Sequence, residues 1–320
     1  MVTFKEIEEY YLKVRSNIRK KRSVNNFELL YYVNIHNLVN NINNGYIYSK
    51  YNIFFIKEKK YRLILSNNIN DKVYNHLVSD NILSKLDKYL IDSNVASRKN
   101  KGTKYGRKLL DRYLVKMKNK YDVFYILKFD IKKYFFNIDH HILLNKLSKY
   151  LNNNELNIIK NILSLTNESY INEYINLINN RYHLDLPYYN KDTGLSIGNL
   201  VDQMLGSVFL NDFDHYIKEV LGCKYYIRYV DDGIILLNDK DKLKDIYHKL
   251  KILIKDYKLE FNNKTKIYCS DEGFEFLGIR YIIKNNRIYR RISNRTKKKI
   301  IKRINKSNYK FYKHYFKYLK

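Results

Sequence analysis

The stretch YYIRYVDDGIILL, residues Tyr225–Leu237, places two adjacent aspartates between two runs of apolar and aromatic residues. Runs of this composition predict β-strands. Asp-Gly between two such runs is a common signal for a hairpin turn, so Asp231 and Asp232 could serve only to form that turn. The rest of the chain is needed to decide whether the acidic pair also has a chemical role.

The 320-residue chain is strongly basic, with 61 Lys and Arg against 32 Asp and Glu and a formal net charge of +29. Such a surplus favours a polyanionic partner, and nucleic acid is the first candidate. An AT-rich coding sequence can also supply lysine without selection for binding. That bias does not explain why basic residues cluster in RRISNRTKKKIIKRINK, residues 290–306.

Cys223 and Cys269 are the two cysteines, and neither belongs to a CxxC pair or to a Cys/His pattern at zinc-ligand spacing. A disulfide framework or a structural zinc site is therefore not expected. The N-terminal residues are charged and lack an apolar signal core. No segment approaches the roughly 18 consecutive apolar residues of a membrane span. We expect a cytoplasmic protein with reduced cysteines and no membrane partner.

Hydrophobic spacing predicts that helices and strands alternate along the chain. Helices are expected in residues 1–50 and 71–90, a hairpin around residues 52–65, and another helix after the basic loop SRKNKGTKYG. The further expected elements are a buried strand ending at Asp130, a helix capped by Asp139, a helix following the loop that contains Pro187, a helix near residues 239–257, strand-like pieces in LEFNNKTKIYC and GFEFLGIRYII, and a basic helix in about the last 25 residues. This order indicates an α+β core with helical additions.

A third aspartate, Asp130, ends the apolar strand VFYILKF and lies 231 − 130 = 101 residues before Asp231. Tertiary folding could bring a strand end beside a hairpin tip. Three carboxylates at one place repel one another, so they need a cation. Oxygen ligands suit Mg²⁺, with Mn²⁺ as a possible substitute, and two ions roughly 3.5–4 Å apart would activate a 3′-hydroxyl and stabilise leaving pyrophosphate. In a basic chain we favour this metal site over separate roles as a strand-end cap and turn formers.

Five segments resemble the motifs of reverse transcriptases, in the family's order and at compatible spacing, from about residue 60 to 285. They are LKFDIKKYFFNIDH, TGLSIGNLVDQMLGSVFLNDFDHYIK, the YxDD box YVDD, LEFNNKTKI and FEFLGIRY. YxDD alone is weakly specific, whereas five ordered motifs are highly specific. The resemblance implies an α+β right-hand polymerase, with a fingers-like region in residues 1–120, a palm with an antiparallel sheet in 121–285, and a short basic helical thumb-like region in 286–320.

The resemblance also implies roles for individual residues. Asp130 and Asp231 would be the principal metal ligands, with Asp232 as the second acid of the box. The main-chain carbonyl of Ile131 matches a further ligand position. Phe135 falls at the steric-gate position, where an aromatic ring crowds a 2′-hydroxyl and favours dNTPs; an ordinary core aromatic is the alternative.

Other matching positions would contact nucleotide or nucleic acid. Gln203 would lie against the incoming nucleotide, and Lys264 would protonate pyrophosphate or steady its charge, unless it is a solvated surface lysine. Arg62 and Lys72 lie where family members contact triphosphate or template. Arg98, Lys99 and Lys101 are expected to contact nucleic acid from the loop SRKNKGTKYG, for which a flexible basic surface loop is the alternative. The other expected nucleic-acid contacts are Gly194, Gly198, Lys297, Lys298 and Lys299.

The second motif departs from the family pattern at two positions. Related bacterial enzymes commonly have GLPIGNLTSQ, whereas this chain has GLSIGNLVDQ. Ser196 replaces proline, and Asp202 replaces a small hydroxyl residue. The added carboxylate could alter template grip or fidelity, so it puts the detail of substrate selection in doubt.

The IGNxxxQ form of the second motif is similar to that of diversity-generating-retroelement and phage-defence reverse transcriptases. The leading hypothesis is an RNA-directed DNA polymerase that makes cDNA from RNA, in phage defence. Sequence diversification is an alternative purpose, and a non-catalytic RNA-binding module with a polymerase-like fold is an alternative of another class. The implied partners are an RNA template, a primer with its cDNA, and dNTPs, with a dedicated noncoding RNA or an accessory protein as further candidates.

Overall fold

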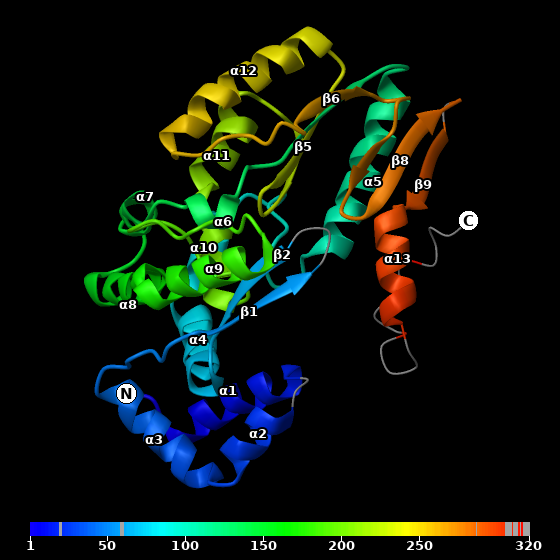
Figure 1. Cartoon of the computed structure of the whole chain (residues 1–320). Coiled ribbons are helices and arrows are strands. Elements are labelled where there is room, and N and C mark those ends of the chain that lie inside the picture. The colour runs from blue at the N-terminus through cyan, green and yellow to red at the C-terminus, as the bar shows by residue number, and fades with distance from the viewer. Residues whose placement is uncertain are drawn as a thin grey trace. The chain divides into compact units, whose positions relative to one another are not determined.

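The computed structural model describes residues 1–18, 21–57, 61–285, 287–304, 309, 313 and 315 (Figure 1). The chain divides into two compact units, each formed by two separate stretches of sequence. Unit 1 consists of Met1–Leu90 and Lys133–Phe209, and unit 2 consists of Ile91–Lys132 and Leu210–Lys320. None of the helices in the described ranges is long and apolar enough to cross a bilayer.

Unit 1 is mainly helical and contains one two-stranded sheet. Its elements are α1 (Phe4–Asn17), α2 (Lys21–Glu28), α3 (Tyr31–Asn43), β1 (Asn52–Lys57), β2 (Tyr61–Ser66), α4 (Ile69–Asn81), a 3-10 segment (Leu83–Tyr89), α6 (Tyr134–Asn137), α7 (His140–Leu147), α8 (Asn153–Ser164), a 3-10 turn (Leu165–Asn167), α9 (Ser169–Tyr182) and α10 (Leu200–Phe209). Local signals set several boundaries. Thr3 caps α1 in a capping box with Glu6, and Asp139 caps α7 by accepting a hydrogen bond from the Ile142 amide.

Two hydrophobic clusters hold unit 1 together. One joins α1, α2 and α3 to the start of α4 around the buried side chains of Tyr11, Ile35 and Val73. The other joins the β1–β2 hairpin to α9, where Leu65 and Ile175 are buried. Alternate β2 residues enter this core because successive strand side chains point to opposite faces.

Unit 2 contains two antiparallel sheets and their covering helices. Its elements are α5 (Thr103–Lys120), β3 (Tyr125–Phe129), α11 (Asn211–His215), a π-helical turn (Tyr216–Val220), β4 (Tyr225–Tyr229), β5 (Asp232–Leu237), α12 (Lys240–Asp256), β6 (Lys266–Cys269), β7 (Phe274–Phe276), β8 (Ile279–Lys284), β9 (Arg287–Ile292) and α13 (Asn294–Arg303). The strand orders are β4-β5-β3-β6 and β7-β8-β9.

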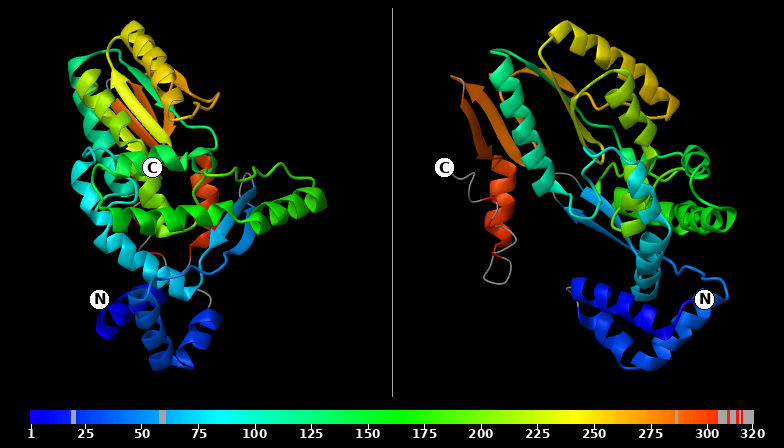
Figure 2. Two further views of the ribbon diagram at one scale, coloured as in Figure 1. Left: turned by 90° about the vertical axis from the view of Figure 1, so that its left-hand side faces the viewer. Right: turned by 180° about the vertical axis from the view of Figure 1, so that it is seen from behind.

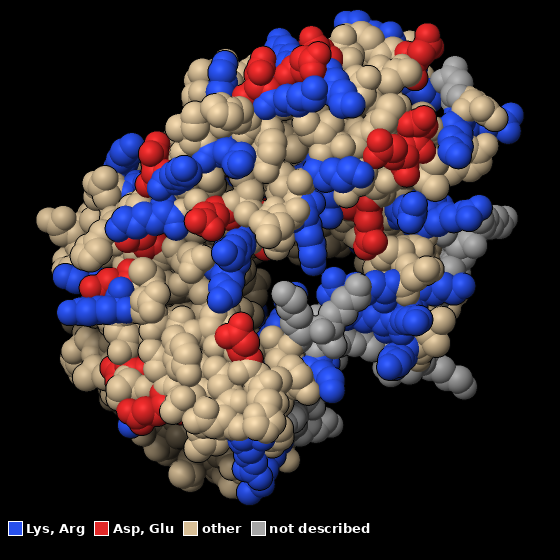
Figure 3. All heavy atoms as spheres, turned by 45° about the horizontal axis from the view of Figure 1, so that its top comes forward, with Lys and Arg blue, Asp and Glu red and all other residues tan. Residues whose placement is uncertain are grey.

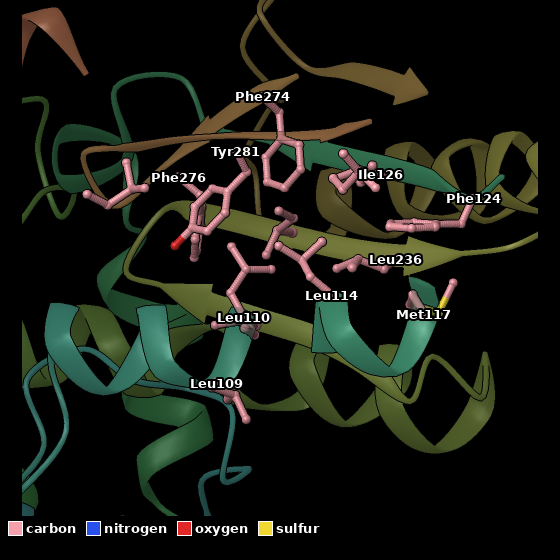
Figure 4. Packing of buried hydrophobic residues seen from close by; sticks show 14 of the residues in the cluster. Leu109, Leu110, Leu114, Met117, Phe124, Ile126, Leu236, Phe274, Phe276 and Tyr281 are labelled. Carbon is pink, nitrogen blue, oxygen red and sulfur yellow. The ribbon is translucent and has the colours of Figure 1, made fainter. Parts of the chain in front are cut away.

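The larger sheet of unit 2 is covered on both faces. Figures 1 and 2 show α5 and the β7–β9 sheet on one side of it and α12 on the other. On the first side, Phe274 and Tyr281 meet Leu110 of α5 and Ile126 of β3 (Figure 4). A sheet buried on both faces needs nearly continuous apolar strands, as in the YILKF run of β3. The end of β3 and the β4–β5 turn are therefore held on a rigid support.

Most expected elements of the chain are present where the sequence places them. They include the 52–65 hairpin, the strand before Asp130, the Asp139 cap and the helix near 239–257. The expected strand-like piece GFEFLGIRYII forms two paired strands, β7 and β8, and a further strand that was not expected, β9, pairs with β8. The basic C-terminal helix begins as α13, and most of its expected remainder lies outside the described residues.

Candidate active site

The β4–β5 hairpin turns at Val230 and Asp231, because Tyr229 and Asp232 are the last residues paired across it. The turn therefore comes earlier than the Asp-Gly dipeptide suggests, and Asp232 and Gly233 already belong to β5. Val230 has φ 58°. A β-branched residue with positive φ is strained, and strain of this kind clusters at functional sites.

Gly233 is required for packing rather than for the turn. A Cβ atom at this position would lie 2.0 Å from Cζ of Phe129, the residue directly opposite it on β3. The Phe129 ring packs in turn against Phe213, Tyr226 and Phe261. Since the glycine lets this ring lie flat on the sheet, the end of β3 fits closely beside the acidic turn.

The backbone around Asp130 is fixed from both sides. The β3–β5 register pairs Phe129 with Gly233, so its continuation by one residue brings Asp130 opposite Asp232. On the other side, the Asn262 amide donates to the Asp130 carbonyl at 2.7 Å. Ile131 is buried and pairs with Phe261 in an isolated antiparallel bridge. The backbone hydrogen bonds on either side of this bridge run from the Lys132 amide to the Glu260 carbonyl and from the Asn262 amide to the Asp130 carbonyl, so neither uses the Ile131 carbonyl.

The three aspartates interact electrostatically. Burial, then the charges of Asp232 and Asp130, raise the pKa of Asp231 to about 7. Burial raises the pKa of Asp232 as well, opposed by the nearby Lys128 ammonium. Crowded carboxylates with raised pKa values gain from a bound cation, which stabilises their charged forms.

The donor set fits a hard divalent cation. Asp130 lies close enough to Asp231 for its charge to raise the pKa of the Asp231 carboxyl, and both residues offer only oxygen ligands, the type that Mg²⁺ prefers. Asp232 of β5 and Lys128 of β3 lie on the same face of the sheet, because Lys128 pairs with Ile234, two residues after Asp232. Among the residues that the structure describes, no three His, Cys, Asp or Glu side chains form a preassembled metal cluster. The pair Asp130–Asp231 is thus the centre of the candidate site, with Asp232 beside it.

A buried arginine that no sequence motif singles out fixes the acidic turn. Arg228 of β4 is fully buried and forms a bidentate ion pair with Asp214 of α11, with both N–O distances at 2.7 Å. Its remaining nitrogen, Nη1, donates to the carbonyl of Val230 at 2.7 Å. Arg228 therefore holds the strained residue that immediately precedes Asp231. A charged residue inside the apolar run YYIRYV was the available signal.

Arg228 also joins the turn to the loop before α5. Its amide donates to the Ser93 carbonyl at 3.1 Å, and its carbonyl accepts from the Val95 amide at 3.0 Å. Tyr226 completes the arrangement by donating to Asp214 at 2.7 Å. The buried ion pair is consequently surrounded by hydrogen bonds, which is the condition under which such a pair is tolerated.

Phe135 and Gln203 lie on neighbouring elements of unit 1. Phe135 is half-buried in α6, and its ring contacts Gly206 of α10, where an added Cβ would lie 3.3 Å from the ring. Gln203 is exposed one helical turn before Gly206, on the same face of α10. Tyr134 anchors α6 by donating to the Gly206 carbonyl at 2.5 Å. Phe135, the candidate steric gate, and Gln203, the candidate nucleotide contact, are thus both positioned by α10.

The two departures in the glycine-loop motif are partners of each other. Ser196 and Asp202 are both buried, and the Ser196 hydroxyl donates a short hydrogen bond to the Asp202 carboxylate. Asn199 donates to Ser196 Oγ at 2.5 Å. Burial raises the pKa of Asp202, hydrogen bonding by Ser196 and Asn199 offsets part of this rise, and the resulting pKa is about 6. The added carboxylate is therefore enclosed within unit 1 rather than exposed toward a ligand.

Gly194 occupies a position that no other residue would fill easily. Its φ is 91°, and a Cβ would lie 2.6 Å from the Tyr189 ring. Its carbonyl lies 2.7 Å from His140 Nε2. Gly198, with φ 125°, follows in the same loop, beside Ile64 of β2. These glycines shape the loop that leads into α10.

The remaining predicted contacts fall into two groups. Arg98 and Lys101 already have partners in their loop, since Arg98 donates to the carbonyls of Ile91 and Asn94, and Lys101 bonds to Asp92. Lys72 is half-buried, and burial lowers its pKa. The exposed basic residues are Arg62 on β2, Lys99 in the loop before α5, Lys264 just before β6, and Lys297, Lys298 and Lys299 on α13.

An antiparallel sheet that carries carboxylates at a strand end and at an adjacent hairpin turn is the arrangement expected of a polymerase palm. The sequence profile of the reverse transcriptase (RNA-dependent DNA polymerase) family matches residues 50–281, which is most of the chain. The chain therefore belongs to the reverse transcriptase family. No curated protein matches its sequence.

Solved telomerase structures share the fold. The chain is similar to telomerase from Candida albicans with a fragment of telomeric RNA (TM-score 0.51, 12% identity, 76% of this chain and 45% of that chain). It is also similar to C-terminally truncated telomerase from Candida tropicalis (TM-score 0.51, 14% identity, 75% and 55%). The chain thus spans about half the length of these structures, and identities this low establish the α+β polymerase fold alone.

Proposed function

We propose that the chain is an RNA-directed DNA polymerase that synthesises cDNA on an RNA template. The observation that carries this proposal is the meeting of Asp130 and Asp231, 101 residues apart in sequence (231 − 130), with Asp232 beside them in a family-matching palm. Neighbouring carboxylates that are partly withdrawn from water are costly to keep charged unless a cation offsets their repulsion. The non-catalytic alternative leaves that cost unexplained.

In this proposal Asp130, Asp231 and Asp232 hold the divalent ions, together with the Ile131 carbonyl. Two Mg²⁺ ions, or Mn²⁺ in their place, would activate the primer 3′-hydroxyl and stabilise pyrophosphate. The protein's own part is to keep these ligands fixed. Arg228 does so through the Val230 carbonyl, and Asn262 does so through the backbone of Asp130.

Further residues are proposed to serve substrate and nucleic acid. Phe135 would exclude the 2′-hydroxyl of rNTPs, and Gln203 would contact the incoming dNTP. Cationic groups would neutralise triphosphate and backbone phosphates. The proposed triphosphate or pyrophosphate contacts are Arg62, Lys72 and Lys264, and the proposed template or duplex contacts are Lys99, Lys297, Lys298 and Lys299. Residues 1–120, 121–285 and 286–320 are proposed as the fingers-like, palm and thumb-like regions.

The decisive experiment is primer extension by purified protein with Mg²⁺, dNTPs and an RNA template, including any RNA that co-purifies. We expect Asp231→Asn to abolish extension and to leave RNA binding nearly unchanged, because it removes a metal ligand and little else. Asp245→Asn, a matched change at an exposed position on α12, should extend normally. Full activity in Asp231→Asn would refute the metal assignment, and an inactive wild type on every template would favour the RNA-binding module.

We propose phage defence as the biological role, supported by the form of the IGNxxxQ motif in residues 197–203. Cells that carry the native locus should then restrict phage plaques, and Asp231→Asn should remove the protection. A neighbouring template/variable repeat pair with no effect on plaques would instead indicate sequence diversification.

A further inference from the structure

Gly206 lies inside α10, where glycine is unfavourable for the helix itself. Glycine is one of the poorest helix formers and alanine the best, because glycine loses the most backbone freedom on folding. Gly206 is buried, and its φ is not in the left-handed region, so the backbone at this position does not require glycine. The reason for a glycine here therefore lies in what packs against it.

Two adjacent aromatic rings of α6 lie over Gly206. A Cβ atom on Gly206 would be 3.3 Å from Cε1 and 3.6 Å from Cζ of Phe135, and 3.6 Å from Cε1 of Tyr134. Carbon atoms in ordinary contact are about 3.5–4.0 Å apart. An added methyl group would thus be accommodated beside Tyr134 but would press on the Phe135 ring.

The surroundings of α6 leave the Phe135 side chain as the part that can give way. Tyr134 is buried and donates to the Gly206 carbonyl at 2.5 Å, so its ring is held on α10. The main chain of Phe135 is held by the glycine loop, because its carbonyl accepts from the Leu195 amide at 2.6 Å. The Phe135 side chain itself is half-buried. A methyl group at position 206 would therefore turn this ring away from α10, toward its exposed side.

Charge cannot separate the two kinds of nucleotide that Phe135 is proposed to distinguish. Lys and Arg side chains are spread over the face of the molecule in Figure 3, and such cations would contact the triphosphate that dNTPs and rNTPs share. The two substrates differ by one 2′-hydroxyl, which an uncharged ring rejects by occupying its space. The distance by which the Phe135 ring stands out from α10 is therefore the quantity that matters.

We propose that Gly206 is a specificity-determining residue: by letting the Phe135 ring lie close on α10, it sets how much room remains for the sugar of the incoming nucleotide. This inference rests on the proposed function, in which Phe135 excludes the 2′-hydroxyl. Gly206 acts through the Phe135 ring rather than by contact with substrate, so it is a positioning residue.

The test measures single-nucleotide primer extension on an RNA template, with Mg²⁺ and either dGTP or GTP opposite a template cytosine. The selectivity is the ratio of kcat/KM for dGTP to kcat/KM for GTP, which does not depend on the folded fraction of the enzyme. The variants are Gly206→Ala, Phe135→Ala and the double variant. The matched control is Gly106→Ala, at a buried glycine of α5 where an added Cβ would press on Leu277 and Val95.

We expect Gly206→Ala to raise the selectivity about 3- to 20-fold, mainly through a larger KM for GTP, because small changes in a close-fitting pocket discriminate by factors of this order. The variant should fold, because alanine favours the helix. Phe135→Ala should relax the selectivity. In that background Gly206→Ala should have no further effect, since residues that act through one contact are not additive. Gly106→Ala should leave the selectivity at the wild-type value.

The outcomes separate this inference from the proposed function. If Phe135→Ala relaxes the selectivity while Gly206→Ala leaves it unchanged or lowers it, Gly206 does not set the position of the gate. If Gly206→Ala has the same effect with and without the Phe135 ring, or if Gly106→Ala matches it, the effect is general overpacking. Unchanged selectivity in Phe135→Ala would instead refute the gate, and an inactive wild type would refute the polymerase; the inference would fail with either.

Discussion

At the scale of single residues, Arg228 connects the fold to the chemistry. We expect Arg228→Lys to lower kcat about 10- to 100-fold, because lysine keeps the charge but cannot hold both Asp214 and the Val230 carbonyl, and small misplacements of catalytic groups are costly. Template affinity should not change. Steady-state primer extension, corrected for the folded fraction, measures the effect.

The control for this variant is a second arginine–aspartate pair in the same unit. Arg290 bonds to Asp111 at 2.6 Å, and the same Arg→Lys change there should leave kcat unaltered. If both variants lost the same share of kcat, Arg228 would have only a general structural role.

Asp202 should make stability fall as pH rises. Its pKa is about 6 in the folded protein against an ordinary 3.8, so between these values the folded state holds a proton that the unfolded state has released. The free energy of unfolding should therefore decrease by up to about 3 kcal/mol between pH 4 and pH 7, relative to Asp202→Asn. Urea unfolding of both proteins across this range measures the difference. A pH-independent difference would mean that Asp202 is not buried as described.

At the scale of elements, the close contact of β3 with β5 depends on Gly233. Gly233→Ala should lower the free energy of unfolding by about 1–3 kcal/mol, because its methyl group would overlap the Phe129 ring and overpack the sheet. The double variant Gly233→Ala/Phe129→Leu should recover part of the loss. Additive losses in denaturant melts would show that this contact is not the cause.

The same elements show what a sequence can and cannot predict. Strand ends, the hairpin and the Asp139 cap follow local patterns, so Asp130 and Asp231 could be named in advance. The positive φ of Val230 and the pairing of Arg228 with Asp214 depend on tertiary contacts between a strand and a helix. No local period encodes such contacts. Ser196 and Asp202 are visible as departures, but their pairing appears only once the loop folds onto α10.

At the scale of the whole molecule, unit 2 depends on two distant stretches of sequence. Its central strand β3 comes from Ile91–Lys132, whereas its neighbours β5 and β6 come from Leu210–Lys320. We expect a fragment of residues 210–320 to show no cooperative unfolding transition in urea, since without β3 the larger sheet loses its middle and exposes two edges. A sharp transition with the enthalpy of a folded domain would contradict this view.

The enclosed Ser196–Asp202 pair also couples two positions that lie six residues apart in the chain. Removal of the serine alone would leave a buried carboxylate without its hydroxyl donor, whereas removal of the aspartate alone would leave a hydroxyl that Asn199 still contacts. Position 202 can therefore be changed at lower cost than position 196, and the two are best exchanged together.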